Sequence, residues 1–329
     1  MGRVIWGKAG GTTGCWYPLV FAPVTKETAW GGWRLWQRLN RCPRAAKTGE
    51  FWEISAFPGM VTKVDVGPLR GIGLDYLAAV DPEGLLGRGK AGLEFPLLVK
   101  LIAAEESLSV QVHPDDRTAC ALGGRGKEEA WYVLHAEPGS RIVCGVKPGT
   151  NRRRLAAALE RGELPACLRQ LPVTTGDFVP IPAGCIHSLG AGVLVLEIQQ
   201  SADTTYRLYD WGRVDDRGLP RALHIEEGLA AAKLSCRPVV LRPWQQRKLL
   251  YHGVHFRITK RRINGRQQQA QDPAAFRIWS VVQGRLLVTA ASARLTLERG
   301  ASLLIPAGVG WWRVEGEAVI LETGLADRG

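Results

Sequence analysis

Two short stretches near the middle of the sequence carry side chains that commonly bind metal ions. In LSVQVHPDD (108–116), Gln111 and His113 are two positions apart. If this stretch is a β-strand, both side chains point to the same face, because the faces alternate with every residue. In GRGKEEAWYVL (124–134), a strand would carry Glu129 on one face in the same way. The two stretches therefore offer an amide, an imidazole and a carboxylate.

A further candidate ligand lies in a loop that the sequence contains twice. The stretches GDFVPIPAGCIHSLG (176–190) and GASLLIPAGVGWWRV (300–314) share a Gly–Pro–Gly frame, and the position three residues after the last Gly of the frame is His187 in the first and Trp311 in the second. No QxH pair precedes the second copy, and Arg277 stands near the position that corresponds to Glu129. We therefore expect a metal site only at the first loop, and a metal-free second copy in which Trp311 packs and stabilises.

Gln111, His113, Glu129 and His187 together form a nitrogen and oxygen ligand set that suits Zn²⁺ with an open position for substrate or water. Taken singly, each residue also has a structural interpretation, since a lone His is more often a surface or core residue than a ligand. The occurrence of all four in order favours the metal site. The remaining histidines, His135, His224, His252 and His255, have no comparable context.

The elements that must position these residues are mainly β-strands. After residue 171, short apolar runs such as GVLVLEIQQ and EAVILETG alternate with Gly and Pro turns, which is typical of a barrel or jelly roll. FPLLVKLIAA (95–104) reads as a buried strand, and helical segments are expected at about 75–87 and 151–170. Gly162 and Pro165 should divide the second of these into two short helices.

The repeated loop extends this expectation to two barrels. EAWYVLHAEPG (129–139) and RIWSVVQG (277–284) also resemble each other, and each precedes one copy of the loop. We therefore predict a mainly β protein made of two jelly-roll barrels with a small helical segment. The expected parts are a flexible tail (1–18), a domain that carries the candidate ligands (19–238) and a metal-free barrel (239–329).

Composition excludes several classes of protein. The 329 residues contain no apolar run long enough for a membrane helix, and the N-terminus does not resemble a secretory signal. Seven scattered cysteines without a CxxC pair argue against a disulfide framework and fit the reducing cytoplasm. The net charge of +12 comes from dispersed clusters, which argues against nucleic acid and leaves a small anionic substrate as a candidate partner.

The PxGxxH loop matches the second motif of the cupin β-barrels, and the QxH variant of the first motif resembles the type I phosphomannose isomerase family. This resemblance runs along most of the chain. It rests on PVTKETAWGG (23–32), GEFWEIS (49–55), VQVHPDD (110–116), GKEEAWYVL (126–134) and EIQQSADTTYRLYDWGR (197–213). It implies a cytoplasmic isomerase, a monomer or weak oligomer, that interconverts the phosphosugars mannose 6-phosphate and fructose 6-phosphate with one Zn²⁺ per chain.

The resemblance also implies roles for individual residues. The family's zinc ligands fall on the four residues assembled above, and its essential arginine falls on Arg207. Other active-site positions of the family fall on Lys127, Glu197 and Asp203, and positions near the substrate phosphate fall on Ser109 and Lys100. Two of these assignments have structural alternatives: Arg207 in a salt bridge with Asp203 or Asp210, and Lys100 as a lysine whose stem only passes the core.

The chemistry of such a reaction explains the residue types. Moving a carbonyl between C1 and C2 requires a base that takes a proton from one carbon and returns it to the next, through a cis-enediolate. Glu197 and Lys127 are the two candidate bases, and the sequence does not choose between them. Two other functions stay open: a non-catalytic cupin that binds sugar phosphates, and an Fe²⁺ cupin oxygenase, which the amide ligand disfavours.

Overall fold

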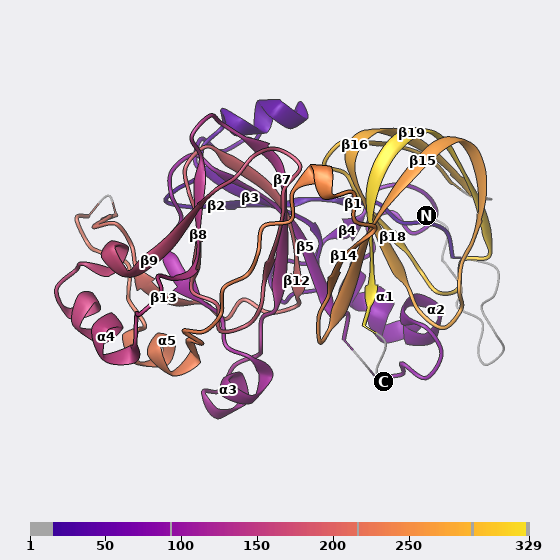
Figure 1. The fold of residues 1–329 in the computed structure, drawn as a ribbon. Coiled ribbons are helices and arrows are strands. Elements are labelled where there is room, and N and C mark those ends of the chain that lie inside the picture. Colours follow the sequence, from indigo (N-terminus) through magenta and orange to yellow (C-terminus); the bar gives the residue numbers. More distant parts are fainter. Residues whose placement is uncertain (1–15, 93, 216, 291–292, 327–329) are drawn as a thin grey trace. The chain divides into compact units, whose positions relative to one another are not determined.

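The computed structural model describes residues 16–326 except 93, 216 and 291–292. Its contacts divide the described chain into two compact units: one made of residues 24–53 and 97–255 (the 97–255 unit), the other of residues 16–23, 54–96 and 256–326 (the 256–326 unit). Both consist mainly of strands, so the predicted mainly β class is confirmed (Figure 1). No described helix has the length and hydropathy of a membrane span.

The units are not the two successive blocks that the repeats suggested. Residues 54–96 belong with the C-terminal strands, because Phe95 packs on Phe276 with ring centroids 5.0 Å apart and the amide of Ala307 donates to the carbonyl of Leu85. The expected tail, residues 1–18, lies outside the described residues except for 16–18, and there Tyr17 is buried.

The 97–255 unit contains two antiparallel sheets. Their strands are β2 (Val24–Glu27), β3 (Thr48–Ile54), β5 (Leu97–Ala104), β6 (Val110–Val112), β7 (Glu129–Ala136), β8 (Arg141–Val146), β9 (Leu168–Pro172), β10 (Phe178–Ile181), β11 (His187–Leu189), β12 (Val193–Gln200) and β13 (Tyr206–Tyr209). The short strand β14 (Leu249–His252) is part of neither sheet. One sheet has the order β10-β7-β12-β5-β3-β2 and the other β13-β6-β11-β8-β9.

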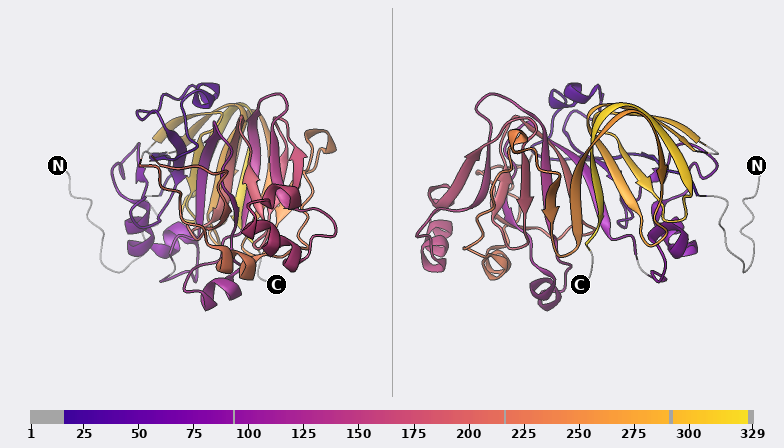
Figure 2. Two further views of the ribbon diagram at one scale, coloured as in Figure 1. Left: turned by 90° about the vertical axis from the view of Figure 1, so that its left-hand side faces the viewer. Right: turned by 45° about the vertical axis from the view of Figure 1, so that its right-hand side comes forward.

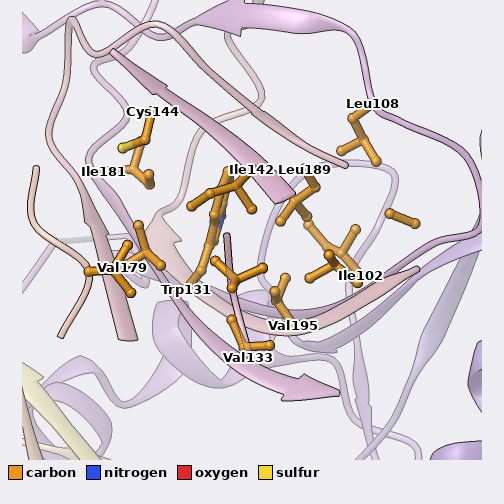
Figure 3. Close-up of a cluster of buried hydrophobic side chains, with 14 of the residues drawn as sticks. Ile102, Leu108, Trp131, Val133, Ile142, Cys144, Val179, Ile181, Leu189 and Val195 are labelled. Carbon is orange, nitrogen blue, oxygen red and sulfur yellow. The ribbon is translucent and has the colours of Figure 1, made fainter. Parts of the chain in front are cut away.

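The core of this unit lies between its two sheets. Trp131 and Val195 from the first sheet meet Ile142 and Leu189 from the second in one buried cluster (Figure 3). The expected buried strand at 95–104 is β5, in which all eight residues are buried. Burying these apolar side chains favours the fold by about 25 cal/mol per Å² of apolar surface. The sheets therefore form a stiff frame for the polar residues described below.

Short helices accompany the sheets: η1 (Leu35–Leu39), α3 (Asp116–Ala121), α4 (Arg152–Glu160), η2 (Leu164–Cys167), α5 (Ile225–Ala231) and η3 (Pro243–Gln245). The pair expected within 151–170 is α4 and η2, with Gly162 at φ 68° between them. Leu155 of α4 and Ala231 of α5 pack in one cluster, so these two helices lie side by side (Figure 1).

The 256–326 unit contains a small sheet of β1 (Phe21–Ala22) and β4 (Lys63–Val64) and a large one of long strands. The large sheet contains β15 (Phe256–Ala270), β16 (Arg277–Ala290), β17 (Ala293–Glu298), β18 (Ser302–Ile305) and β19 (Trp311–Leu325). Strand β19 pairs with β15 and β16, and all three curve side by side (Figure 2). The helix expected at 75–87 is two helices, α1 (Leu74–Val80) and α2 (Pro82–Leu86).

Two expectations about this unit are corrected. The helix divides because Pro82 has no amide hydrogen and the Asp81 side chain caps the new start by accepting from the amide of Gly84. The prediction that Trp311 packs is wrong, because Trp311 is 69% exposed. Its neighbour Trp312 is 3% exposed, and successive residues of a strand point to opposite faces.

Candidate metal centre

Three of the expected functional residues form one row across the second sheet of the 97–255 unit. Gln111 on β6 lies directly opposite His187 on β11 and directly opposite Arg207 on β13. Residues that lie opposite each other in antiparallel strands project from the same face. Three strands that are far apart in sequence therefore present an amide, an imidazole and a guanidinium toward the same side.

The other two expected ligands complete a compact group. His113 follows the end of β6, and Glu129 begins β7 in the first sheet. Nε2 of His113 and Nε2 of His187 are each 3.3 Å from an oxygen of Glu129, and Nε2 of Gln111 is 3.3 Å from Nε2 of His187. Ligand atoms of the two histidines and the glutamate lie within 4.8 Å of one another. The structure thus brings all four predicted ligands together.

The protonation of the imidazoles suits a metal ion. Nδ1 of His113 lies 2.8 Å from the carbonyl of Thr204, and Nδ1 of His187 lies 2.9 Å from the carbonyl of Cys185. A carbonyl only accepts hydrogen bonds, so each ring carries its hydrogen on Nδ1 and directs the Nε2 lone pair toward Glu129. Burial and the nearby Lys127 ammonium lower the pKa of His113 to about 3, which keeps this ring neutral.

The carboxylate of Glu129 is fully buried, and neither of its oxygens meets a donor in good hydrogen-bonding geometry among the described residues. Burial by itself would raise the pKa of Glu129, but the Lys127 ammonium lowers it well below its usual range. Lys127 compensates this buried carboxylate on one side, and the two imidazole lone pairs that face it suit a second cation. The four residues therefore fit a divalent metal ion such as Zn²⁺.

Lys127 supplies a positive charge beside this group. Its Nζ is 2.8 Å from Oε2 of Glu129 and 3.0 Å from Nε2 of His113. Burial by itself would lower the pKa of Lys127, but the carboxylates of Glu129 and Glu197 outweigh it and raise the pKa well above its ordinary value. Lys127 is therefore an ammonium ion in this environment.

Glu197 lies on β12, directly opposite Lys100 on β5 and Trp131 on β7. Its Oε2 accepts a 2.8 Å hydrogen bond from Nε1 of Trp131. Burial and the charge of Glu129 raise the pKa of Glu197 to about 7. A carboxyl group that titrates near neutral pH is suited to general acid–base catalysis.

Lys100 is buried in an ion-pair network. Its Nζ lies 3.5 Å from Oε2 of Glu50 and 3.8 Å from Oε1 of Glu197, and 4.3 Å from the centre of the Trp52 ring. Its charge is thus compensated inside the unit, so its stem does not merely pass the core on the way to solvent. Glu50, which lies in GEFWEIS (49–55), was not among the residues expected at the site. The sequence signal that points to it is an acidic residue within an otherwise apolar strand.

The remaining predicted residues lie around this group. Oγ of Ser109 donates to Oε1 of Gln111 at 3.4 Å. Asp203 is partly exposed and lies 3.6 Å from Nζ of Lys26. Burial raises the pKa of Glu50, but Lys100 and then Lys26 lower it, and the net shift is downward. Asp203 and Lys26 thus form a solvent-reached ion pair near a buried cluster of charges.

Arg207 does not form the structural salt bridge that was its alternative interpretation. Asp210 instead binds Arg213 at 2.6 Å and Arg221 at 2.5 Å. Nη1 of Arg207 donates to the carbonyl of Ala222 at 2.7 Å, and its buried Nε has no partner in the described part of the chain. Burial and the neighbouring Arg221 guanidinium lower the pKa of Arg207. Arg207 therefore keeps donor capacity for a ligand.

Comparison with known proteins identifies the family of this chain. Residues 19–139 match the catalytic domain of type I phosphomannose isomerase, and residues 248–323 match the cupin domain of mannose-6-phosphate isomerase. A mannose-6-phosphate isomerase of Streptococcus mutans is 35% identical over 311 residues, which are 92% of this chain and 97% of that protein. The chain belongs to the type I phosphomannose isomerase family. The resemblance found from the sequence motifs is confirmed, and the chain is an isomerase.

Other members of the family agree in sequence and in fold. A mannose-6-phosphate isomerase of Bacillus subtilis is 33% identical over 92% of this chain and 96% of its own length. A crystal structure of a mannose 6-phosphate isomerase from Bacillus subtilis has a TM-score of 0.81 at 32% identity and covers 93% of this chain and 99% of that one. A mannosephosphate isomerase described as putative, from Archaeoglobus fulgidus, has the same fold, with a TM-score of 0.76 at 22% identity.

Proposed function

We propose that this phosphomannose isomerase family member interconverts D-mannose 6-phosphate and D-fructose 6-phosphate through a cis-enediolate, with one Zn²⁺ per chain. The observation that carries the proposal is the convergence of His113, Glu129 and His187 within 4.8 Å, beside a carboxyl group of raised pKa. Gln111 would be the fourth ligand. A bound zinc ion would supply Lewis-acid polarisation of the sugar oxygens.

Of the two candidate bases, the electrostatics favour Glu197. Its pKa of about 7 gives a substantial carboxylate fraction at neutral pH, and Trp131 fixes its orientation. Glu197 would take the proton from one carbon and return it to the other. Lys127, held as an ammonium by the carboxylates around it, would offset the negative charge of the enediolate instead of removing a proton.

The residues around this pair would bind and orient the sugar. Arg207 would donate hydrogen bonds to the developing oxyanion, because it has donors that no described residue uses. Asp203, in its solvent-reached ion pair with Lys26, would orient or open the sugar ring. Ser109 and Lys100 remain the proposed contacts near the phosphate, and Lys100 would act there through its network with Glu50 and Glu197. We also propose cytoplasmic action as a monomer or weak oligomer.

A single purified sample tests the proposal. Metal analysis should give one zinc per chain, and a coupled assay should show conversion of mannose 6-phosphate to fructose 6-phosphate. His187→Ala should lose metal and activity together, because it removes one ligand and leaves a buried carboxylate less compensated. His252→Ala is the matched control, since His252 is exposed on β14. A fully active zinc-free protein would contradict the proposal, and sugar-phosphate binding without turnover would favour the non-catalytic alternative.

A further inference from the structure

A cavity of about 360 Å³ lies in the 97–255 unit, on the face of the second sheet that is turned away from the metal centre. Ile142 on β8 and Leu189 on β11 point into the core between the two sheets (Figure 3). Their neighbours Val143 and Ser188 lie directly opposite each other and line the cavity. Successive residues of a strand project from opposite faces, so the cavity is separate from the side on which His187 projects.

Trp211 is the aromatic residue that lines this cavity. Its backbone has φ 61°, in the left-handed region that residues other than glycine seldom adopt. Nε1 of Trp211 donates a 2.7 Å hydrogen bond to the carbonyl of Leu108, and the ring packs edge-on against Tyr209 with centroids 5.3 Å apart. The residue is nevertheless 36% exposed. Strained residues of this kind cluster at sites that bind ligands.

The charged side chains that line the cavity compensate one another. Arg34 forms ion pairs with Glu105, at 3.1 Å from Nε to Oε2, and with Glu137 through Nη1. Arg141 donates to the carbonyl of Gln170 at 3.2 Å. The two cations and the two carboxylates carry no net charge together, and both cations already have partners. The cavity therefore suits a neutral ligand better than an anion.

These groups still have hydrogen-bonding capacity for a ligand. A carboxylate has about four lone-pair positions and a guanidinium has five N–H donors, so the ion pairs leave Arg34, Glu105 and Glu137 with unused positions. Oγ of Ser107 accepts from the amide of Ala191 at 3.3 Å, and none of the described residues accepts its hydroxyl hydrogen. Acceptors, donors and an aromatic ring thus line one cavity, which matches a ligand with several hydroxyl groups and an apolar C–H face.

We propose that this cavity is a binding site for a neutral saccharide, separate from the metal centre. The C–H face of a pyranose ring lies on the indole of Trp211. The sugar hydroxyls donate to Glu105 and Glu137 and accept from Arg34. The cavity volume falls in the usual range for small ligands. A molecule of about a dozen non-hydrogen atoms should bind there with a Kd of about 1 mM, at the ligand efficiency of ordinary small ligands.

The test uses methyl α-D-mannopyranoside, a sugar without a phosphate whose methylated anomeric oxygen prevents isomerisation. The full-length protein is titrated by isothermal titration calorimetry, and we expect saturable binding. Trp211→Ala and Glu137→Ala should each raise the Kd about tenfold or more, because each removes one wall of the cavity. Trp244→Ala is the matched control and should keep the Kd, since Trp244 is 71% exposed in the same unit and does not line the cavity.

A further variant separates this cavity from the metal centre. Arg207→Lys should keep the Kd, because Arg207 lies opposite Gln111 and projects from the inner face of the sheet. Circular dichroism checks the folding of each variant, and Glu137→Ala keeps the test valid if Trp211→Ala does not fold.

Three results would overturn the inference. The first is the absence of saturable binding by the wild type. The second is a wild-type Kd in Glu137→Ala together with a raised Kd in Arg207→Lys, which would place the glycoside at the metal centre. The third is displacement of the glycoside by inorganic phosphate, which would show that the cavity takes anions. An inactive isomerase would not affect the inference, since the readout does not use turnover.

Discussion

The indole of Trp131 donates a 2.8 Å hydrogen bond to Oε2 of Glu197, and the same ring packs edge-on against His187 with centroids 5.4 Å apart. Trp131 thus connects the proposed base with a proposed metal ligand. The 256–326 unit contains a matching pair, in which Nε1 of Trp279 donates to Oε2 of Glu322 at 2.7 Å. In both units the two residues lie directly opposite each other on paired strands.

This duplication provides a matched test of Trp131. Trp131→Phe removes a hydrogen bond to a buried carboxylate, which should cost about 1.5–3 kcal/mol of unfolding free energy and reduce kcat about tenfold because Glu197 loses its orientation. Trp279→Phe removes the equivalent bond in the 256–326 unit, which contains none of the proposed site residues, and should leave kcat unchanged. Steady-state kinetics and urea unfolding of both variants distinguish a catalytic role of Trp131 from a purely structural one. Equal kcat in the two variants would show that Trp131 has only a structural role.

The raised pKa of Glu197 predicts a specific pH dependence of stability. In the folded metal-free protein Glu197 keeps its proton up to about pH 7, whereas an unfolded glutamate releases it near pH 4.5. Between these values the folded state binds more protons, so the free energy of unfolding should fall as the pH rises, by up to about 1.4 kcal/mol per pH unit. Urea unfolding of wild type and Glu197→Gln across this range should show the contribution of Glu197 only in the wild type. If the unfolding free energies of wild type and Glu197→Gln change in parallel with pH, the pKa of Glu197 is not raised.

Arg207 should contribute to catalysis through donors that the protein itself leaves unused. Replacing it by Lys keeps the positive charge but loses the planar set of donors, including the buried Nε. We expect kcat/KM to fall about 10²–10³-fold, as on loss of an oxyanion donor. Arg266→Lys serves as the control, because Arg266 is exposed and binds only Glu315 among the described residues. Unchanged kcat/KM in Arg207→Lys would remove Arg207 from the mechanism.

The two adjacent tryptophans of the second loop should differ sharply in their contribution to stability. Trp312→Ala should lower the unfolding free energy by about 3–5 kcal/mol, because Trp312 is buried against Trp279 with ring centroids 4.7 Å apart. Trp311→Ala should change it by less than about 0.5 kcal/mol, since Trp311 is mostly exposed. Thermal or urea unfolding of the two variants compares them directly. A large loss in Trp311→Ala would mean that its side chain is covered in solution.

Several features could be predicted from the sequence because they depend on local pattern. Alternation along a strand placed Gln111 and His113 on one face, apolar runs predicted strands such as β5, and the motifs identified the isomerase family. The Trp311 prediction failed for an equally local reason. A single step along β19 reverses the face, and the repeated loop does not fix which of two consecutive tryptophans points inward.

The sequence by itself determined the family, the mainly β class and the residue types available for chemistry. Only the tertiary structure decided their charge states and partners. Glu197 has a raised pKa because two sheets bury it near Glu129, and Lys100 is committed to Glu50 and Glu197 across strands. Desolvation and Coulomb interactions depend on distance in space, and residues far apart in the chain set that distance.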